Sequence, residues 1–574
     1  MADIGERDWS FCLRLLSNSI RDTSAAGGGT DASDAAVLQA VKRLQKLCKE
    51  EQSADLVARV YPAIAKLFQR YTASGSSLRP SHGLILLAIL QFFLDFGDSV
   101  LHDTDLSIRL FFRSCLSRLF ADEAVAKATF DFLLLNKTKF LLAHTGILPQ
   151  FFPLILKIAA WGQESLSNSF LELVPMLMGP SSFLPLFPAL LDMPTLVLAL
   201  ERLEERSGSV LNSDAAARPQ SPAPEALLAL MDEAYTGGVG GAEAESGDEG
   251  DSKSRDETDA LFADLLKDEN EGLAERHWSF PGMEAAVQAV MGSTLSEKLK
   301  HAFKFTPTVL QLYFDLALRD VNDSLLCALL PIVFLRVDAM FPNKQFSSQA
   351  RKKCIEFVLA AFRQKPHFIA VLKKPIMDRL GQPHTSTAKA ELALQLCWAV
   401  GEYGGGGSTN KDAARQLFES LELVLYENLA SSRASRGSVG AERLKMPGTL
   451  VPGSPAQARL LCFVVTAIAK IASYHRELSP RARVCLAKVA RSHQVVDKAV
   501  WKRARDYLGL MQEPAICQSI LGSSVGYKHP TNVQWSEGRT KAVANIPFYL
   551  LGEKEGPPFH DFRLSDILGG AAQT

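Results

Sequence analysis

The sequence predicts an all-α protein, an α-solenoid of the HEAT or armadillo kind with a disordered acidic insertion. Apolar residues recur at helical spacing through most of the chain, and no stretch alternates with a sustained period of two. A chain of 574 residues is also too long for all its helices to surround one core. Stacked helix pairs solve that problem because each pair buries its apolar face on its neighbours. No strict consensus repeat is visible, and two separate helical bundles remain the alternative.

The N-terminal part of the predicted solenoid covers residues 1–211. Two helices near its start carry large apolar residues three or four positions apart, with charged residues between them. These stripes are Val37, Val41, Leu44 and Leu47, followed by Val57, Tyr61, Ile64, Leu67 and Tyr71. Two later runs, 84–94 and 183–200, are more continuously apolar. Polar residues and prolines interrupt both before the ~20 residues that a membrane span needs, so we expect buried helices.

The composition changes abruptly between residues 212 and 275. This segment contains three prolines near its start, the glycine-rich run 237–241 and the acidic stretch 243–259. Such a sequence buries too little apolar surface to offset its ordering entropy, so we expect a disordered linker. Two short apolar patches within it, 227–231 and 261–266, are either transient helices or docking motifs. The alternative is an acidic surface insertion without a partner.

The C-terminal part of the predicted solenoid covers residues 276–522. Helical stripes recur at 355–362, 417–425 and 460–471. Flexible loops are expected near 404–411, which is rich in glycine, and at 431–455, which is rich in Ser, Gly and Arg. Residues 523–574 are punctuated by Gly and Pro and predict an extended tail. The tail either packs along the solenoid or docks its aromatic end on another subunit.

Charge and metal-ligand spacing exclude several function classes. The chain has 62 Lys+Arg against 63 Asp+Glu, a net charge of −1, which argues against a protein that coats nucleic acid. Its nine cysteines form no CxxC pair, and none of its eleven histidines pairs with a second ligand at metal spacing. We expect buried, reduced thiols and neither a metal nor a cofactor. The first ten residues lack the apolar core of a secretory signal.

No catalytic motif stands out, and we expect that the protein is not an enzyme. The stretch 404–411 reads Gly-Gly-Gly-Gly-Ser-Thr-Asn-Lys, which invites comparison with a phosphate-binding loop. A Walker A loop needs Gly-Lys-Ser/Thr in that order after a strand, whereas here the hydroxyls precede the lysine. A flexible turn explains the glycines better. A serine nucleophile remains an alternative, because the residues of a catalytic triad come together in space and not in sequence.

Two basic clusters lie close together in one helical region. They consist of Arg351, Lys352 and Lys353, and of Lys373 and Lys374. The simpler interpretation is that these residues cover a solvated helix face. The functional alternative is contact with anionic headgroups of a cytosolic membrane leaflet, or with an acidic partner subunit.

One helix ends in Trp398, Gly401, Glu402 and Tyr403, a Trp-x-x-Gly-Glu-Tyr pattern. This pattern resembles the large-chain trunks of adaptor protein complexes, which select vesicle cargo. Four further segments are similar to zeta subunits of the fifth such complex. They are 169–175, 188–195, 418–422 and 513–516. The chain is shorter than the usual trunk of that family, and the insertion and the tail match it less clearly.

The resemblance implies a helical trunk without enzymatic activity, in a heterotetramer with beta, mu and sigma subunits. It also implies protein sorting, independent of clathrin, in endosomal and lysosomal vesicle trafficking. The implied location is cytoplasmic, peripherally on late endosome and lysosome membranes. Spatacsin- and spastizin-like scaffold proteins are the further implied partners, and no nucleic acid is expected.

The signature residues also have a purely structural interpretation, which we favour over direct cargo recognition. Trp398 would fill space between helix pairs, Gly401 would permit close helix approach, and Glu402 with Tyr403 would close the helix end by hydrogen bonds. Two competing functions share the helical architecture: a nuclear transport solenoid, and a scaffold associated with DNA repair. The charge balance and the missing phosphate loop disfavour the second.

Overall fold

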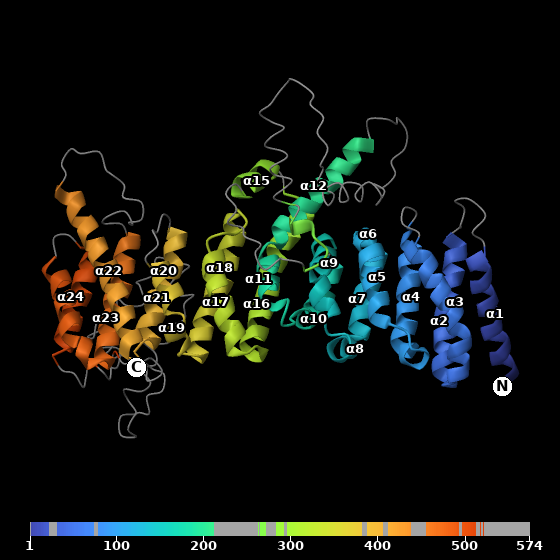
Figure 1. The fold of residues 1–574 in the computed structure, drawn as a ribbon. Coiled ribbons are helices and arrows are strands. Elements are labelled where there is room, and N and C mark those ends of the chain that lie inside the picture. Colours follow the sequence, from blue (N-terminus) through green and yellow to red (C-terminus); the bar gives the residue numbers. More distant parts are fainter. Residues whose placement is uncertain are drawn as a thin grey trace, which may run out of the picture. The chain divides into compact units, whose positions relative to one another are not determined.

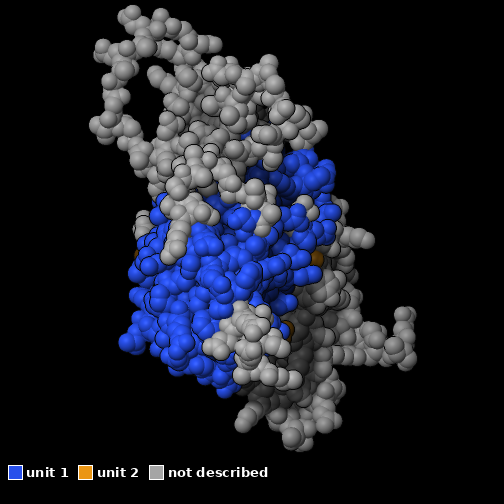
Figure 2. All heavy atoms as spheres, turned by 90° about the vertical axis from the view of Figure 1, so that its right-hand side faces the viewer, with its two compact units in different colours: residues 1–313, 341–346 blue, residues 314–340, 347–574 orange. Residues whose placement is uncertain are grey.

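The computed structural model is mainly helical in the residues that it describes, and none of these residues lies in a strand (Figure 1). The all-α prediction is therefore confirmed. The described residues are 2–21, 31–73, 78–162, 164–211, 262, 264–270, 283–291, 295–380, 387–405, 411–437, 455–492, 496–512, 517 and 521. The chain divides into two compact units. Unit 1 consists of residues 1–313 and 341–346 and unit 2 of residues 314–340 and 347–574, drawn in blue and orange in Figure 2.

Unit 1 begins with four helices that pack on near neighbours in the chain. They are α1 (Ala2–Arg21), α2 (Asp31–Glu51), α3 (Ala54–Ala73) and α4 (Pro80–Phe96), which a 3-10 turn, η2 (Gly97–Val100), follows. Helix α1 contacts α2 and α3, and both of these contact α4. The predicted stripes face these contacts, because all their residues are buried except the half-buried Tyr61. Burial of such stripes is the main source of helix stability in proteins.

The remaining helices of unit 1 include several short ones and several that contain proline. They are α5 (Thr104–Phe111), the π-helical turn η3 (Phe112–Leu116), α6 (Ser117–Leu119), α7 (Glu123–Leu135), α8 (Lys137–Leu142), α9 (Ile147–Trp161), η4 (Glu164–Leu166), α10 (Ser167–Leu177), α11 (Phe183–Leu191), α12 (Met193–Leu211), η5 (Asp264–Leu266), α15 (Met283–Val290) and α16 (Glu297–Asp320) as far as Tyr313. Asp103 and Asp122 cap α5 and α7, because their carboxylates accept from the backbone amides of Leu106 and Val125. Helix α7 contacts α4 and α10, and α9 contacts α10 and α12.

Unit 2 is organised around α23 (Pro455–Tyr474), whose residues between Leu460 and Ala472 are buried. The other elements are α17 (Asp323–Arg336), α18 (Lys344–Gln364), α19 (Phe368–Val371), α20 (Lys373–Leu380), α21 (Thr387–Tyr403), α22 (Lys411–Gly437), η7 (Arg476–Leu478), α24 (Ser479–Arg491) and α25 (Lys498–Leu510). Helix α23 contacts α21, α22, α24 and α25. A helix that is apolar on every side needs neighbours on every side, which α23 has.

The division into compact units differs from the predicted domains. In sequence it falls within α16, whereas the prediction divides the chain at 212–275. Residues 262 and 264–270 of the predicted linker belong to the packed part of unit 1. The predicted loop at 431–455 begins too early, because α22 continues to Gly437. Gly404 and Gly405 form a buried turn directly after α21, as predicted from 404, and residues 406–410 lie outside the described residues. The rest of the predicted linker and the tail 523–574 lie outside the described residues.

Two helices are long and apolar enough to cross a membrane by length and composition alone, although the sequence predicts no span. They are α4 with its 3-10 extension, Pro80–Val100, and α23, and the bent pair α11 and α12 would make a third. However, 83% of the apolar stretch in α23 is buried inside the protein, and 56% of that in Pro80–Val100 is buried. The apolar residues of α23 are therefore accounted for by packing within unit 2.

Candidate interaction sites

Gly401, in the signature, lies at a close approach of α21 to α23. A Cβ atom added at Gly401 would be 2.8 Å from the Cα of Ala467 and 3.0 Å from its Cβ. Real Cβ atoms do not come that close to a neighbouring backbone, so no residue larger than glycine fits without separating the helices. This geometry supports the structural interpretation of Gly401.

The other signature residues are also turned into unit 2. The Glu402 carboxylate forms an ion pair with the ammonium group of Lys470 on α23, and their side chains are 1% and 6% exposed. Tyr403 is buried, and burial raises the pKa of its hydroxyl. The ring of Trp398 meets that of Tyr403 edge-on, with 5.9 Å between centroids. These contacts favour packing over direct recognition of cargo.

Lys470 is a partner that the sequence interpretation missed, since it assigned Glu402 to the end of its own helix. Its signal is visible in the sequence all the same: Lys470 is the one charged residue in the buried run between Leu460 and Ala472. Charged side chains are seldom fully buried unless they are paired. A lone lysine in such a run therefore predicts a buried acidic partner, without saying which one.

The two basic clusters come from α18 and α20, which both contact the turn after α17. The Nε of Arg351 donates to the carbonyl of Val337 over 3.3 Å, and Arg379 of α20 pairs with Asp338. Burial lowers the pKa of Arg351, whose side chain is half-buried. All five basic residues remain as candidates. Lys374 is exposed, Lys352, Lys353 and Lys373 are half-buried, and Lys353 pairs with Glu356 over 3.3 Å.

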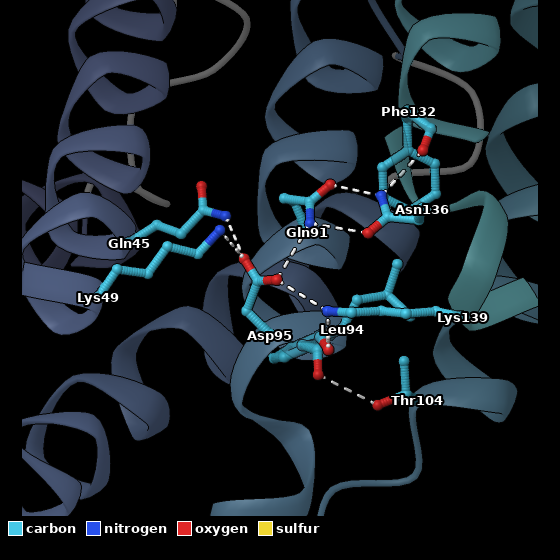
Figure 3. A network of polar contacts seen from close by, with 10 residues as sticks. Gln45, Lys49, Gln91, Leu94, Asp95, Thr104, Phe132, Asn136 and Lys139 are labelled. Atoms are coloured by element: carbon cyan, nitrogen blue, oxygen red, sulfur yellow. Dashed lines mark hydrogen bonds and ion pairs between the residues drawn. The ribbon is translucent and has the colours of Figure 1, made fainter. Parts of the chain in front are cut away.

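In unit 1, a carboxylate joins three helices (Figure 3). Asp95 of α4 pairs with Lys49 of α2 over 2.7 Å and with Lys139 of α8 over 2.8 Å, and it accepts from Gln45 over 2.6 Å. Burial by itself raises the pKa of Asp95, but the hydrogen bonds from Lys139, Lys49 and Gln45 outweigh it and lower the pKa below its ordinary value. This network fixes the spacing of neighbouring helices.

Replacement of Asp95 by asparagine is expected to lower the free energy of unfolding by about 1–2 kcal/mol at neutral pH, because two charge-assisted bonds are lost. A depressed pKa stabilises the fold above the ordinary pKa of 3.8, and that contribution is lost as the pH falls through the folded-state value. Urea titrations should therefore show the gap between the wild type and Asp95→Asn closing in acid. The matched control is Asp55→Asn, in the exposed pair with Arg59, which should change little. A gap that persists in acid would contradict this account.

Another polar site, in unit 1, lies where residues 264–270 pack against α9. Lys157 of α9 is fully buried and pairs with Asp268 over 2.7 Å. The apolar patch 261–266 was predicted either as a transient helix or as a docking motif. Its described residues include the 3-10 turn η5, and their apolar side chains are buried within unit 1. Like Lys470, Lys157 is the one charged residue in a buried apolar helix, here between Ile147 and Ala160.

No group of three or more His, Cys, Asp or Glu side chains suited to a metal ion occurs within the described residues. None of the nine cysteines forms a disulfide, and eight of them are buried, which confirms the predicted buried thiols. Burial raises the pKa of the thiols of Cys115 and Cys397 to about 12.

Two family models match the chain. One, described as AP-5 complex subunit, vesicle trafficking, matches residues 32–157, and the other, described as AP-5 complex subunit zeta-1, C-terminal TPR repeats, matches residues 257–542. TPR repeats are stacked helix pairs, which agrees with the predicted α-solenoid.

Two curated proteins, both named AP-5 complex subunit zeta-1, are similar to the chain over most of its length. The human protein is 24% identical over 90% of this chain, and the mouse protein is 23% identical over 92%. The chain spans 59% and 61% of their lengths. No solved structure matches the chain.

Proposed function

The chain belongs to the family of AP-5 complex zeta subunits, and from that membership we propose that it is a structural subunit of an adaptor protein complex in vesicle trafficking. The observation that carries the proposal is the pair of family matches, one at residues 32–157 and the other, described as C-terminal, at residues 257–542. The proposed role is that of a scaffold and not of an enzyme. Helices that pack on near neighbours suit such a role because they expose long faces to partners.

The finer role that we propose is that of the large trunk in a heterotetramer with beta, mu and sigma subunits. The complex would sort proteins on late endosome and lysosome membranes without clathrin. Spatacsin- and spastizin-like scaffolds are the proposed further partners. The location would be cytoplasmic and peripheral to the membrane.

Affinity capture of the tagged full-length chain from its own cells, followed by mass spectrometry, tests this function. The expected result is recovery of beta, mu and sigma adaptor subunits in near-equal amounts. The matched bait is the chain with Gly509→Ala, an internal helix position where an added Cβ meets nothing within 4 Å, and it should recover the same partners. Recovery of nuclear transport or DNA-repair factors without adaptor chains would overturn the proposal.

We propose that the lysines of α20 and α18 contact the membrane. A second experiment tests this by measuring how the purified chain partitions onto anionic vesicles. Lys373 and Lys374 occupy the first turn of α20, where Glu is tolerated well, so Lys373→Glu/Lys374→Glu should fold normally. At about 1 kcal/mol per basic residue near an anionic surface, the loss of two lowers vesicle partitioning about 30-fold. Lys46→Glu/Lys300→Glu is the control with the same charge change, on exposed lysines of unit 1. Equal partitioning of the two variants would contradict the contact.

A further inference from the structure

Helix α9 is broken in its middle by its own sequence. It contains Pro149 and Pro153, and Phe151 between them has non-helical backbone angles of φ −101° and ψ 17°. A proline has no backbone N–H, so Pro153 cannot donate to the carbonyl of Pro149 as a regular helix requires. The break therefore makes helix backbone groups available to an outside partner.

The chain segment 264–270 supplies those partners. The side-chain amide of Asn270 donates to the Pro149 carbonyl over 3.4 Å, and its backbone N–H donates to the Gln150 carbonyl over 2.7 Å. The backbone N–H of Leu154 donates to the carbonyl of Asp268 over 3.3 Å. In a regular helix the Leu154 N–H would donate to the Gln150 carbonyl. The segment thus completes the backbone hydrogen bonding of the broken helix.

Two cations of unit 1 match the acidic residues of the segment. Lys157 is fully buried, and it donates to the Leu266 carbonyl and to the Asp268 carboxylate. Arg113 donates to both oxygens of Glu269, over 2.5 and 2.9 Å. The hydrogen bonds from Arg113 are the main reason why the pKa of Glu269 lies below its ordinary value. Without the segment, the buried ammonium group of Lys157 would lose both of these contacts inside an apolar helix, which is costly.

The break in α9 also positions Arg113. The guanidinium group lies over the ring of Phe151, 5.8 Å from its centroid, and the ring of Phe112 packs on Phe151 as well. Arg113 belongs to the π-helical turn η3, a kind of distortion that is frequent at functional sites. The apolar end of the segment completes the docking, since Phe262, Leu265 and Leu266 are buried.

We propose that the break in α9, together with Lys157 and Arg113, is a docking site for acidic peptides of partner proteins. Residues 262–270 of this chain are its occupant in cis. The site recognises two buried leucines followed by an acidic pair and an asparagine, a pattern short enough to recur in another protein. A tethered ligand acts at an effective concentration of about millimolar, so a partner displaces it only by binding more tightly or by contacting the chain elsewhere too.

The test uses a fluorescent peptide with the sequence of residues 259–273 and the full-length chain in which residues 262–270 are replaced by a Gly/Ser run of equal length. Fluorescence anisotropy should show micromolar binding to this emptied chain and at least tenfold weaker binding to the wild type, whose site is occupied. In the emptied chain, Arg113→Glu should abolish binding of this peptide and restore binding of a peptide with Glu269→Arg. Arg59→Glu is the matched control, because Arg59 is about as exposed as Arg113.

Absence of peptide binding to a folded emptied chain would overturn the proposal, and so would equal effects of Arg113→Glu and Arg59→Glu. Failure of the charge-reversed peptide to bind would count against the assigned contact in the same way. If the emptied chain is insoluble, Asp268→Ala/Glu269→Ala replaces it, and the peptide should bind this variant more tightly than the wild type because the competing segment is weakened. Equal binding would overturn the proposal. That variant keeps the leucines in place and removes only the acidic contacts.

Discussion

Replacement of Gly401 by valine is expected to lower the free energy of unfolding of unit 2 by about 3 kcal/mol. The added side chain would begin 2.8 Å from the Cα of Ala467, so α21 and α23 must separate over their whole contact. The atoms of Ala467 cannot move aside at low cost, because they include the backbone of a buried helix. Amide hydrogen exchange of α21 and α23, read by mass spectrometry, measures the effect without interference from unit 1.

Gly509 in α25 is the matched control for Gly401. An added Cβ there meets nothing within 4 Å, and the residue lies inside a helix. Gly509→Ala should therefore raise stability by about 0.5–1 kcal/mol, since alanine loses less backbone entropy on folding. A Gly401→Val chain as stable as the wild type would refute the close approach of the two helices.

Removal of Lys470 is expected to have the largest single effect, a loss of about 3–5 kcal/mol in Lys470→Met. The substitution keeps the shape of the side chain but leaves the Glu402 carboxylate buried, with a side chain that is 1% exposed. The cost arises from the remaining charge and not from the lost attraction. Exchange protection of α21 and α23 again provides the measurement.

The double variant Lys470→Met/Glu402→Met separates these two causes. It removes both charges, and it should regain stability to within about 1 kcal/mol of the wild type. Lys46→Met, in an exposed pair with Glu50, should change stability by less than about 0.5 kcal/mol. If the double variant is no more stable than Lys470→Met, the buried charge of Glu402 is not the cause.

The sequence predicts the helices well because their apolar periodicity is a local property. It also leads us to expect a close helix approach at Gly401, and an added Cβ there would lie 2.8 Å from the Cα of Ala467. Partners are another matter: Glu402 and Lys470 are 68 positions apart, and Lys157 and Asp268 are 111 positions apart. Local spacing in the sequence cannot predict which residues form such pairs. A single lysine in an apolar run does indicate that it has an acidic partner.

Composition misled the prediction in two places for opposite reasons. Residues 431–437 are rich in Ser, Arg and Gly, yet they continue α22, because Ala and Arg are good helix formers after a long helix has already been nucleated. Residues 262–270 lie next to a strongly acidic stretch, but their acidic side chains are the ones that unit 1 binds. An acidic composition therefore predicts a solvated segment only where the folded chain has no basic side chain that can pair with it.

The reactivity of the cysteine thiols can report local opening of this chain. Three lie in unit 1 and six in unit 2, from Cys12 in α1 to Cys517, and all but Cys327 are buried. Helices that contact only near neighbours can open separately, so each thiol becomes reactive when its own stretch opens. The order in which a small alkylating reagent modifies them would map local opening along the chain, with no engineered probe.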